Sequence, residues 1–179
     1  MPCPYCINNL GGFMNRRRLA WLLLVVMLFA GSRLLASPHS TAAFKKLLAL
    51  AGQWEGKDEH GMAVTTTFKP MASNTALMET LAASGMEEMV SLYSVDQESI
   101  ALVHYCPTNN QPRMRATPDS DDFKELVFEF QGAGNLKSPT EGHQHRLVIN
   151  FDDANHITET WTWRQNDKDT LMVFHLTRK

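Results

Sequence analysis

The chain has 179 residues, of which 44% are hydrophobic and 20% charged, a composition that fits one globular domain and argues against intrinsic disorder. Four of the 17 basic residues fall within the first 36 positions, which hold no acidic residue, so the remainder carries 13 basic against 19 acidic side chains. Its formal charge of −6 would repel a phosphate backbone, and we therefore expect no nucleic-acid partner.

Residues 1–36 have the composition of a secretory signal peptide. Arg16-Arg17-Arg18 precede an apolar run of 13 residues, Leu19 to Gly31, and Ala36 supplies a small residue for cleavage. The run is shorter than the roughly 20 residues of a membrane-spanning helix, although an uncleaved anchor remains an alternative. We expect an exported protein, periplasmic or secreted, that meets a membrane only through this segment.

Met14, directly before the basic cluster, is a candidate for the true translation start. Cys3 and Cys6 would then lie upstream of the protein, and as a Cys-x-x-Cys pair they lack the second ligand pair of a metal site. After cleavage Cys106 is the only cysteine, so residues 37–179 contain no internal disulfide. Stability must come from a hydrophobic core.

A short helix opens the domain. Ser37 to Thr41 resembles a linker that ends in a capping residue, Ser40 or Thr41. Phe44, Leu47, Leu48 and Ala51 then recur at helical spacing, and Gly52 ends the pattern. Because one helix cannot bury its apolar stripe alone, we expect it to lie against a sheet or to close a barrel end.

Beyond Gly52 the hydrophobic period changes to two, which predicts roughly nine or ten short strands. Gly, Pro, Asn or Asp separates them in nearly every case. The segments are 64–68, 77–81, 89–93, 100–106, 113–117, 123–130, 145–151, 157–163 and 171–177. Even spacing and short connections favour an all-β, antiparallel up-and-down barrel, with a two-sheet sandwich as the alternative. The widest loops, 116–122 and 132–142, are expected at the barrel mouth.

Gly52-Gln53-Trp54 after a short helix, with Arg178 near the end of the last strand, resembles the lipocalin or calycin superfamily. The resemblance implies that Trp54 packs beneath Arg178 and seals one end of the barrel. Such a cation–π contact contributes about 0.5–2 kcal/mol. Its role is structural.

Three further segments are similar to a group of uncharacterised secreted bacterial proteins with calycin-like barrels: Glu79-Thr80-Leu81, His104-Tyr105-Cys106 and Asn110-Gln111-Pro112-Arg113-Met114. That group implies a fold but no activity. Heme-binding barrels of the nitrobindin type also share Trp-x-Gly near the start, and His175 is the only late candidate for their histidine ligand. Asp58 stands where those barrels have a second glycine. We therefore expect no heme and no other cofactor.

Strand alternation places three polar residues with the apolar, inward faces: Glu79, His104 and Glu159. Arg113, just past a turn, is expected to reach the same space, and Trp161 shares the face of Glu159. Because a buried carboxylate needs a partner or a raised pKa, these groups form a candidate polar cluster. Three interpretations stay open: a self-satisfied ion-pair network, ligand contact, or acid–base catalysis by His104 with Glu79 or Glu159.

Other reactive side chains give weaker patterns. Cys106 lies two residues from His104, but a buried structural thiol explains it better than a nucleophile. His143 and His145, with His156, could bind a metal, yet no compact carboxylate or cysteine set accompanies them, so we expect no metal site.

The sequence as a whole favours an exported barrel that binds a small amphiphilic or hydrophobic molecule. A cofactor-free isomerase or hydrolase is the first alternative, and a structural or partner-binding envelope protein is another. Neither the ligand nor the oligomeric state follows from the sequence.

Overall fold

The structure is a computed structural model that describes residues 37–179. The expected signal peptide, Met14 and the Cys3/Cys6 pair lie outside the described residues. Within residues 37–179, no helix has the length and apolar character needed to cross a membrane.

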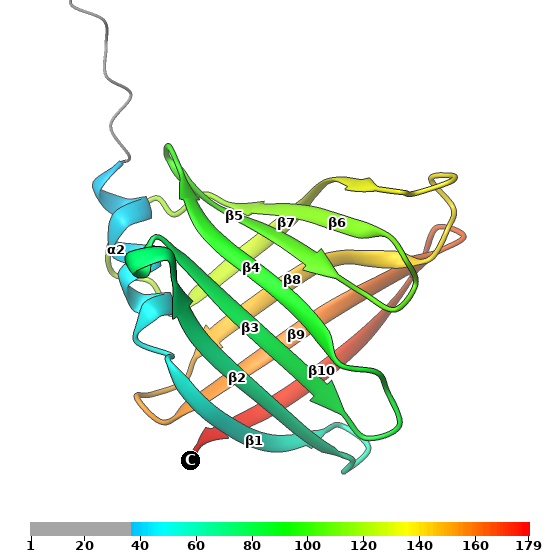
Figure 1. Cartoon of the computed structure of the whole chain (residues 1–179), viewed down its shortest axis with the longest axis horizontal. Helices are drawn as coiled ribbons and strands as arrows, with labels where there is room; N and C mark the ends of the chain where they lie inside the picture. Colours follow the sequence, from blue (N-terminus) through cyan, green and yellow to red (C-terminus); the bar gives the residue numbers. More distant parts are fainter. Residues whose placement is uncertain (1–36) are drawn as a thin grey trace, which may run out of the picture. The chain divides into compact units, whose positions relative to one another are not determined.

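Ten antiparallel strands form a closed barrel in which each strand pairs with its neighbours in sequence and β1 pairs with β10 (Figure 1). The strands are β1 (Gly52–Asp58), β2 (Ala63–Met71), β3 (Ala76–Ala83), β4 (Met89–Asp96), β5 (Ser99–Tyr105), β6 (Gln111–Ala116), β7 (Glu125–Gly134), β8 (His143–Phe151), β9 (His156–Gln165) and β10 (Lys168–Arg178). A 3-10 turn, η1 (Ala72–Asn74), joins β2 to β3. The up-and-down barrel is confirmed, and the sandwich alternative is wrong because closure leaves no second sheet.

The helix α2 (Pro38–Leu48) begins earlier than the sequence pattern indicates. Its N-cap is Ser37, whose hydroxyl accepts a hydrogen bond from the Ser40 backbone N–H, and proline occupies the first helical position. The predicted linker and the Ser40 or Thr41 cap are therefore wrong. Ser40 is instead buried and donates to the Gln97 carbonyl at 2.8 Å, which attaches the helix to the β4–β5 turn.

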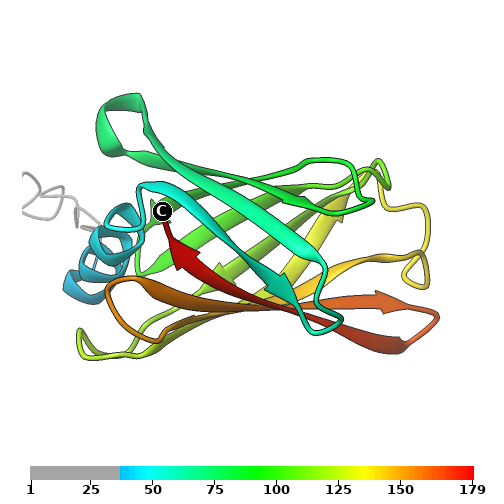
Figure 2. The ribbon, with the colours of Figure 1, turned by 90° about the horizontal axis from the view of Figure 1, so that it is seen from below.

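The helix covers one end of the barrel, which we call the helix end (Figure 2). Ala43 and Leu47 are fully buried in the core. The connections β2–β3, β4–β5, β6–β7 and β8–β9 lie at this end. Loop 117–124 is among them, because Lys46 of the helix donates to the Phe123 carbonyl. The prediction that this loop borders the mouth is therefore wrong, whereas loop 135–142 lies at the opposite, open end.

Trp54 and Arg178 are direct partners in the β1–β10 register. The Arg178 guanidinium lies 4.3 Å from the centre of the indole and donates to the carbonyls of Ala49 and Ala51. The Trp54 Nε1–H donates to the Leu50 carbonyl at 2.8 Å. This arrangement, which the calycin resemblance implies, ties the first strand, the last strand and the end of the helix together.

Candidate functional site

A ladder of polar side chains crosses three adjacent strands inside the barrel. Glu79 on β3 is the register partner of Ser91 on β4, which in turn is the partner of His104 on β5. Each lies on a face whose alternate residues are buried. Glu159 enters from β9, which lies on the opposite side of the ten-stranded ring. The two glutamates therefore meet in the interior only because the barrel closes.

Glu79 and Glu159 are both 0% exposed and hydrogen-bond to each other. Burial raises the pKa of both carboxyls, and the negative charge of Glu79 raises that of Glu159 further, with a smaller contribution from their hydrogen bond. Glu79 accepts additional hydrogen bonds from Tyr93 at 2.6 Å and Thr66 at 3.3 Å, which oppose the rise in its own pKa. The shared proton therefore resides on Glu159, and Glu79 is its acceptor.

The two oxygens of Glu159 agree with this assignment. Its Oε2 accepts the indole N–H of Trp161 at 3.1 Å, whereas no residue within 37–179 donates to Oε1. A protonated Oε1 needs an acceptor rather than a donor. The inner pair is thus a neutral acid that donates to a carboxylate, an arrangement that avoids two buried like charges.

His104 extends the ladder as a neutral imidazole. The side chain is 1% exposed, and burial lowers its pKa to about 4. Its Nδ1 lies 3.0 Å from the Ser91 hydroxyl, and Ser91 in turn slightly opposes the rise in the pKa of Glu79. The His104 ring packs on Trp161 with ring centres 4.7 Å apart.

Arg113, which was expected in the interior, lies elsewhere, and two of the histidines considered as ligands are on the surface. Arg113 is exposed, because Pro112 and Met114 occupy the inward positions on either side of it, so the expectation that it reaches the cluster is wrong. His175 is exposed on β10 and contacts Thr158 at 3.2 Å, which leaves no inward histidine for the heme interpretation there. His156 pairs with Asp153, away from the other histidines.

The structure places four described pockets on the protein, and none is lined by Glu79, His104, Glu159 or Trp161. The ladder is packed within the core, where its members contact one another, although the buried Nε2 of His104 has no hydrogen-bond partner within residues 37–179. An enzyme based on His104 would need a substrate path to a side chain that is almost fully buried. The simplest interpretation is that the ladder is a structural hydrogen-bond network that fixes how the side chains pack in the barrel interior.

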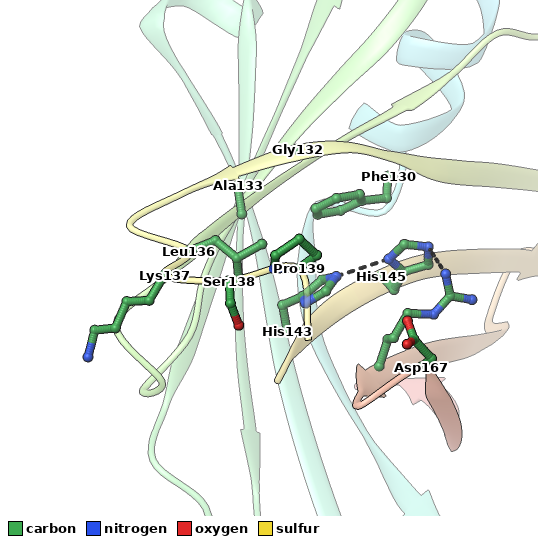
Figure 3. Close-up of a pocket in the computed structure, with 11 residues that line it drawn as sticks. Phe130, Gly132, Ala133, Leu136, Lys137, Ser138, Pro139, His143, His145 and Asp167 are labelled. Atoms are coloured by element: carbon green, nitrogen blue, oxygen red, sulfur yellow. Dashed lines mark hydrogen bonds between the residues drawn. The ribbon is translucent and has the colours of Figure 1, made fainter. Parts of the chain in front are cut away.

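A cleft lies at the open end of the barrel, where β7 and β8 separate. Their pairing stops at Glu129 and Arg146, and both strands carry irregularities just beyond this point. Gln131 is the unpaired residue of β7 and His145 that of β8. Such β-bulges redirect side chains at barrel rims. Here they open a cleft between loop 135–142 and the β9–β10 turn, which we call the rim cleft (Figure 3).

The rim cleft has a volume of about 510 Å³. Its apolar wall is formed by Phe130, Ala133, Leu136 and Pro139, and the Phe130 ring lies over the two histidines (Figure 3). The centre of the Phe130 ring lies 4.7 Å from the centre of the His143 ring and 4.8 Å from that of the His145 ring. The remaining lining is polar: Lys137, Ser138, Arg164 and Asp167. An apolar wall facing a few polar groups is the usual construction of a small-molecule site.

A continuous hydrogen-bond chain fixes the polar side of the rim cleft. Asp169 holds Arg164 through two bonds of 2.7 and 2.8 Å, and Arg164 donates to His145 Nε2 at 2.7 Å. His145 Nδ1 lies 3.0 Å from His143 Nε2, and His143 Nδ1 lies 2.7 Å from the Glu141 carbonyl. Because a guanidinium can only donate and a carbonyl only accept, both imidazoles are neutral with the proton on Nδ1.

The charges around this chain are consistent with neutral imidazoles. Burial lowers the pKa of His145, and the adjacent Arg164 lowers it further. Arg164 in turn lowers the pKa of Asp169 through their hydrogen bonds. The sequence drew attention to His143 and His145 only as metal ligands, a site it did not favour, and it gave no sign of Arg164. Within residues 37–179, no group of three His, Cys, Asp or Glu side chains could hold a metal ion.

A second pocket lies inside the open end, and we call it the sulfur pocket. Its volume is about 240 Å³. The lining residues are Met86, Met89, Cys106, Pro107, Thr108, Gln144, Trp163 and Met172. Gln144 and Trp163 are register partners, as are His143 and Arg164 one residue along. Since successive residues point to opposite faces of a strand, the two pockets lie on opposite sides of β8 and β9.

No protein-family model matches the sequence, and no curated protein sequence does. Among solved structures, the crystal structure of Rv2717c from M. tuberculosis is similar, with a TM-score of 0.56 and 15% sequence identity. The alignment covers 80% of this chain and 99% of that chain. At this identity the likeness shows a shared barrel fold alone.

Proposed function

We propose that this protein is an exported barrel that binds a small amphiphilic molecule in the rim cleft, rather than in the barrel interior. The observation that carries the proposal is the neutral His143–His145 pair, held by Arg164 directly beneath the Phe130 ring. It gives the cleft a rigid polar floor next to an apolar wall. Its volume of about 510 Å³ falls within the range of about 300–1,000 Å³ that is usual for small-molecule sites.

The chemistry of the cleft indicates the kind of ligand. The apolar body would lie against Phe130, Leu136 and Pro139, and a polar end would face the histidines and Asp167. Lys137 points away from the histidines and is exposed, so it adds little to a binding site (Figure 3). Arg164 is already bound by Asp169 and His145. The ligand is therefore expected to be neutral or weakly charged rather than a strong anion.

The test is titration of the purified protein with a fluorescent amphiphilic dye of the anilinonaphthalene type, together with native mass spectrometry. Ala133→Phe should fill the cleft without touching the histidine chain, and Leu136→Ser should remove part of its apolar wall. Losing one such contact costs about 1.5 kcal/mol, which corresponds to about a tenfold rise in Kd. Leu171→Ser is the matched control, because Leu171 is 56% exposed and lies outside the cleft.

Saturable dye binding that both cleft variants weaken and Leu171→Ser leaves unchanged would support the proposal. Equal dye affinity in wild type and Ala133→Phe would refute it. Absence of saturable binding in the wild type would refute it as well.

A further inference from the structure

The hydrogen-bond chain of the rim cleft uses every ring nitrogen of its two histidines. His143 Nδ1 donates to the Glu141 carbonyl at 2.7 Å. His145 Nδ1 donates to His143 Nε2 at 3.0 Å, and His145 Nε2 accepts from Arg164 at 2.7 Å. Neither end of the chain can reverse, because a carbonyl only accepts and a guanidinium only donates. A second proton on either imidazole must therefore break one of these hydrogen bonds.

The bond that breaks is the one between Arg164 and His145. A proton added to His145 binds Nε2, because Nδ1 already carries one. If His143 holds the extra proton instead, that proton comes across the hydrogen bond from His145 Nδ1, and His145 takes its replacement on Nε2. Both routes place an N–H of His145 opposite the N–H donor of Arg164, where no hydrogen bond can form.

The charges around His145 decide when this happens and where Arg164 then goes. The groups that face it come from each neighbouring strand: Glu129 on β7, His143 on β8, Arg164 on β9 and Asp169 on β10. Two more charged groups line the same cleft, Asp167 and Lys137. Burial and then Arg164 hold the pKa of His145 below its ordinary value of 6.5, so the proton binds only in acid.

Arg164 keeps its second partner when it loses His145. It donates to both carboxylate oxygens of Asp169, and these hydrogen bonds hold the pKa of Asp169 below its usual range. The carboxylate is therefore still ionised in acid that protonates a histidine. The guanidinium stays beside Asp169, and the N–H that it had donated to His145 becomes free for another acceptor.

The added charge changes what the cleft can bind. The Phe130 ring stacks on the His145 imidazole with ring centres 4.8 Å apart, and the face of an aromatic ring attracts a cation. The charged imidazole therefore stays beneath Phe130. An anionic end of a ligand would gain two adjacent donors, His145 Nε2–H and the freed N–H of Arg164, as charge-assisted hydrogen bonds. A neutral ligand would lie against a charge that it cannot solvate.

We infer that one proton on the His143–His145 pair reverses the ligand preference of the rim cleft, from neutral amphiphiles near neutral pH to anionic amphiphiles in acid. The inference rests on the proposed function, because it concerns the same cleft. Binding and protonation are linked, so each must act on the other. An anionic ligand should raise the pH at which His145 titrates, and a neutral ligand should lower it.

The experiment compares two dyes that share one apolar body and differ in a sulfonate group, anilinonaphthalene sulfonate and phenylnaphthylamine. Both are titrated onto the purified protein from about pH 8 to about pH 5, the range in which histidines change charge. The ratio of the two Kd values should change by at least about fivefold in favour of the sulfonate as the pH falls. Nuclear magnetic resonance of the side-chain nitrogens follows His145 and Arg164 in the same protein, with and without dye.

Variants separate this proton from other effects of pH. In His145→Gln the amide oxygen can still accept from Arg164 but gains no proton, so the Kd ratio should stay constant. His175→Gln is the matched control, because His175 is exposed on β10 outside the cleft, and it should respond as wild type does. Ala133→Phe should weaken both dyes, which would assign them to the rim cleft. Circular dichroism at each pH checks that the variants are folded.

The outcomes distinguish this inference from the function on which it rests. A Kd ratio that is constant with pH in wild type, or that changes equally in His145→Gln, would overturn the inference and leave the proposed function intact. Side-chain nitrogen signals of His145 and Arg164 that do not change together in acid would overturn it as well, without recourse to any variant. Absence of saturable binding of either dye at every pH would refute the proposed function, and this inference with it.

Discussion

Replacing Glu159 by glutamine tests the assignment of a proton to the buried carboxyl pair. A glutamine amide can still donate to Glu79 and accept the Trp161 N–H, so the hydrogen-bond geometry is retained. What changes is the titration, because glutamine does not need a proton to remain neutral. The substitution should therefore alter how stability depends on pH more than it alters the fold.

Whether stability rises or falls with pH follows from the raised pKa of Glu159. Burial is the larger cause of that rise, and the negative charge of Glu79 is the second. A group whose pKa is higher in the folded state stabilises fully below its unfolded pKa and loses that contribution as pH rises toward the folded pKa. The unfolded reference is 4.5. Wild-type stability should thus fall with rising pH above 4.5, by about 1.4 kcal/mol per pH unit for this proton.

The proton on Glu159 therefore costs more free energy with each pH unit above 4.5, until the pH reaches the raised pKa of the folded protein. Glu159→Gln avoids this cost. We expect the variant to match wild type near pH 4.5 and to exceed it by a margin that grows as the pH rises, by at most about 1.4 kcal/mol per pH unit.

The assay is urea unfolding followed by tryptophan fluorescence at several pH values between 4.5 and 8. Glu125→Gln is the control, because Glu125 is exposed on β7 and its loss should change little. A Glu159→Gln variant that is destabilised equally at every pH would refute the assignment, since Glu159 would then act as an anion whose charge the fold requires.

The remaining predictions concern the barrel end and the rim. Arg178→Met should lower the free energy of unfolding by about 1–2 kcal/mol through loss of the contact with Trp54. In the same urea-unfolding assay, Arg178→Lys should recover only part of this stability, because lysine cannot contact the indole and two carbonyls at once. Full restoration would contradict that geometry. Gly142→Ala would place a methyl group 2.2 Å from Trp163 Cζ2, so the indole must move. We expect altered tryptophan fluorescence and a loss of about 1–3 kcal/mol in the free energy of unfolding. An unchanged spectrum would show that residue 142 does not pack against Trp163.

Much of the barrel follows from the sequence because burial in a strand has a period of two. That period placed Glu79, His104 and Glu159 on inward faces before any contact was known, and the structure puts all three in the interior. The expectation for Arg113 rested on its place after a turn rather than on this period, and it is wrong because Pro112 and Met114 are the inward residues of β6. The hydrophobic pattern does not mark the helix start, because Ser37 and Pro38 carry no apolar period, although serine before proline is a common helix beginning.

The candidate sites depend on tertiary structure. Glu79 and Glu159 share a proton only because ring closure brings opposite walls together. The rim cleft exists because bulges at Gln131 and His145 interrupt the alternation and separate β7 from β8. Its hydrogen-bond chain joins three strands, and the sulfur pocket joins residues up to 86 positions apart. Hydrophobic periodicity is a local property that determines which face of a strand is buried, whereas strand register and barrel closure determine which side chains meet.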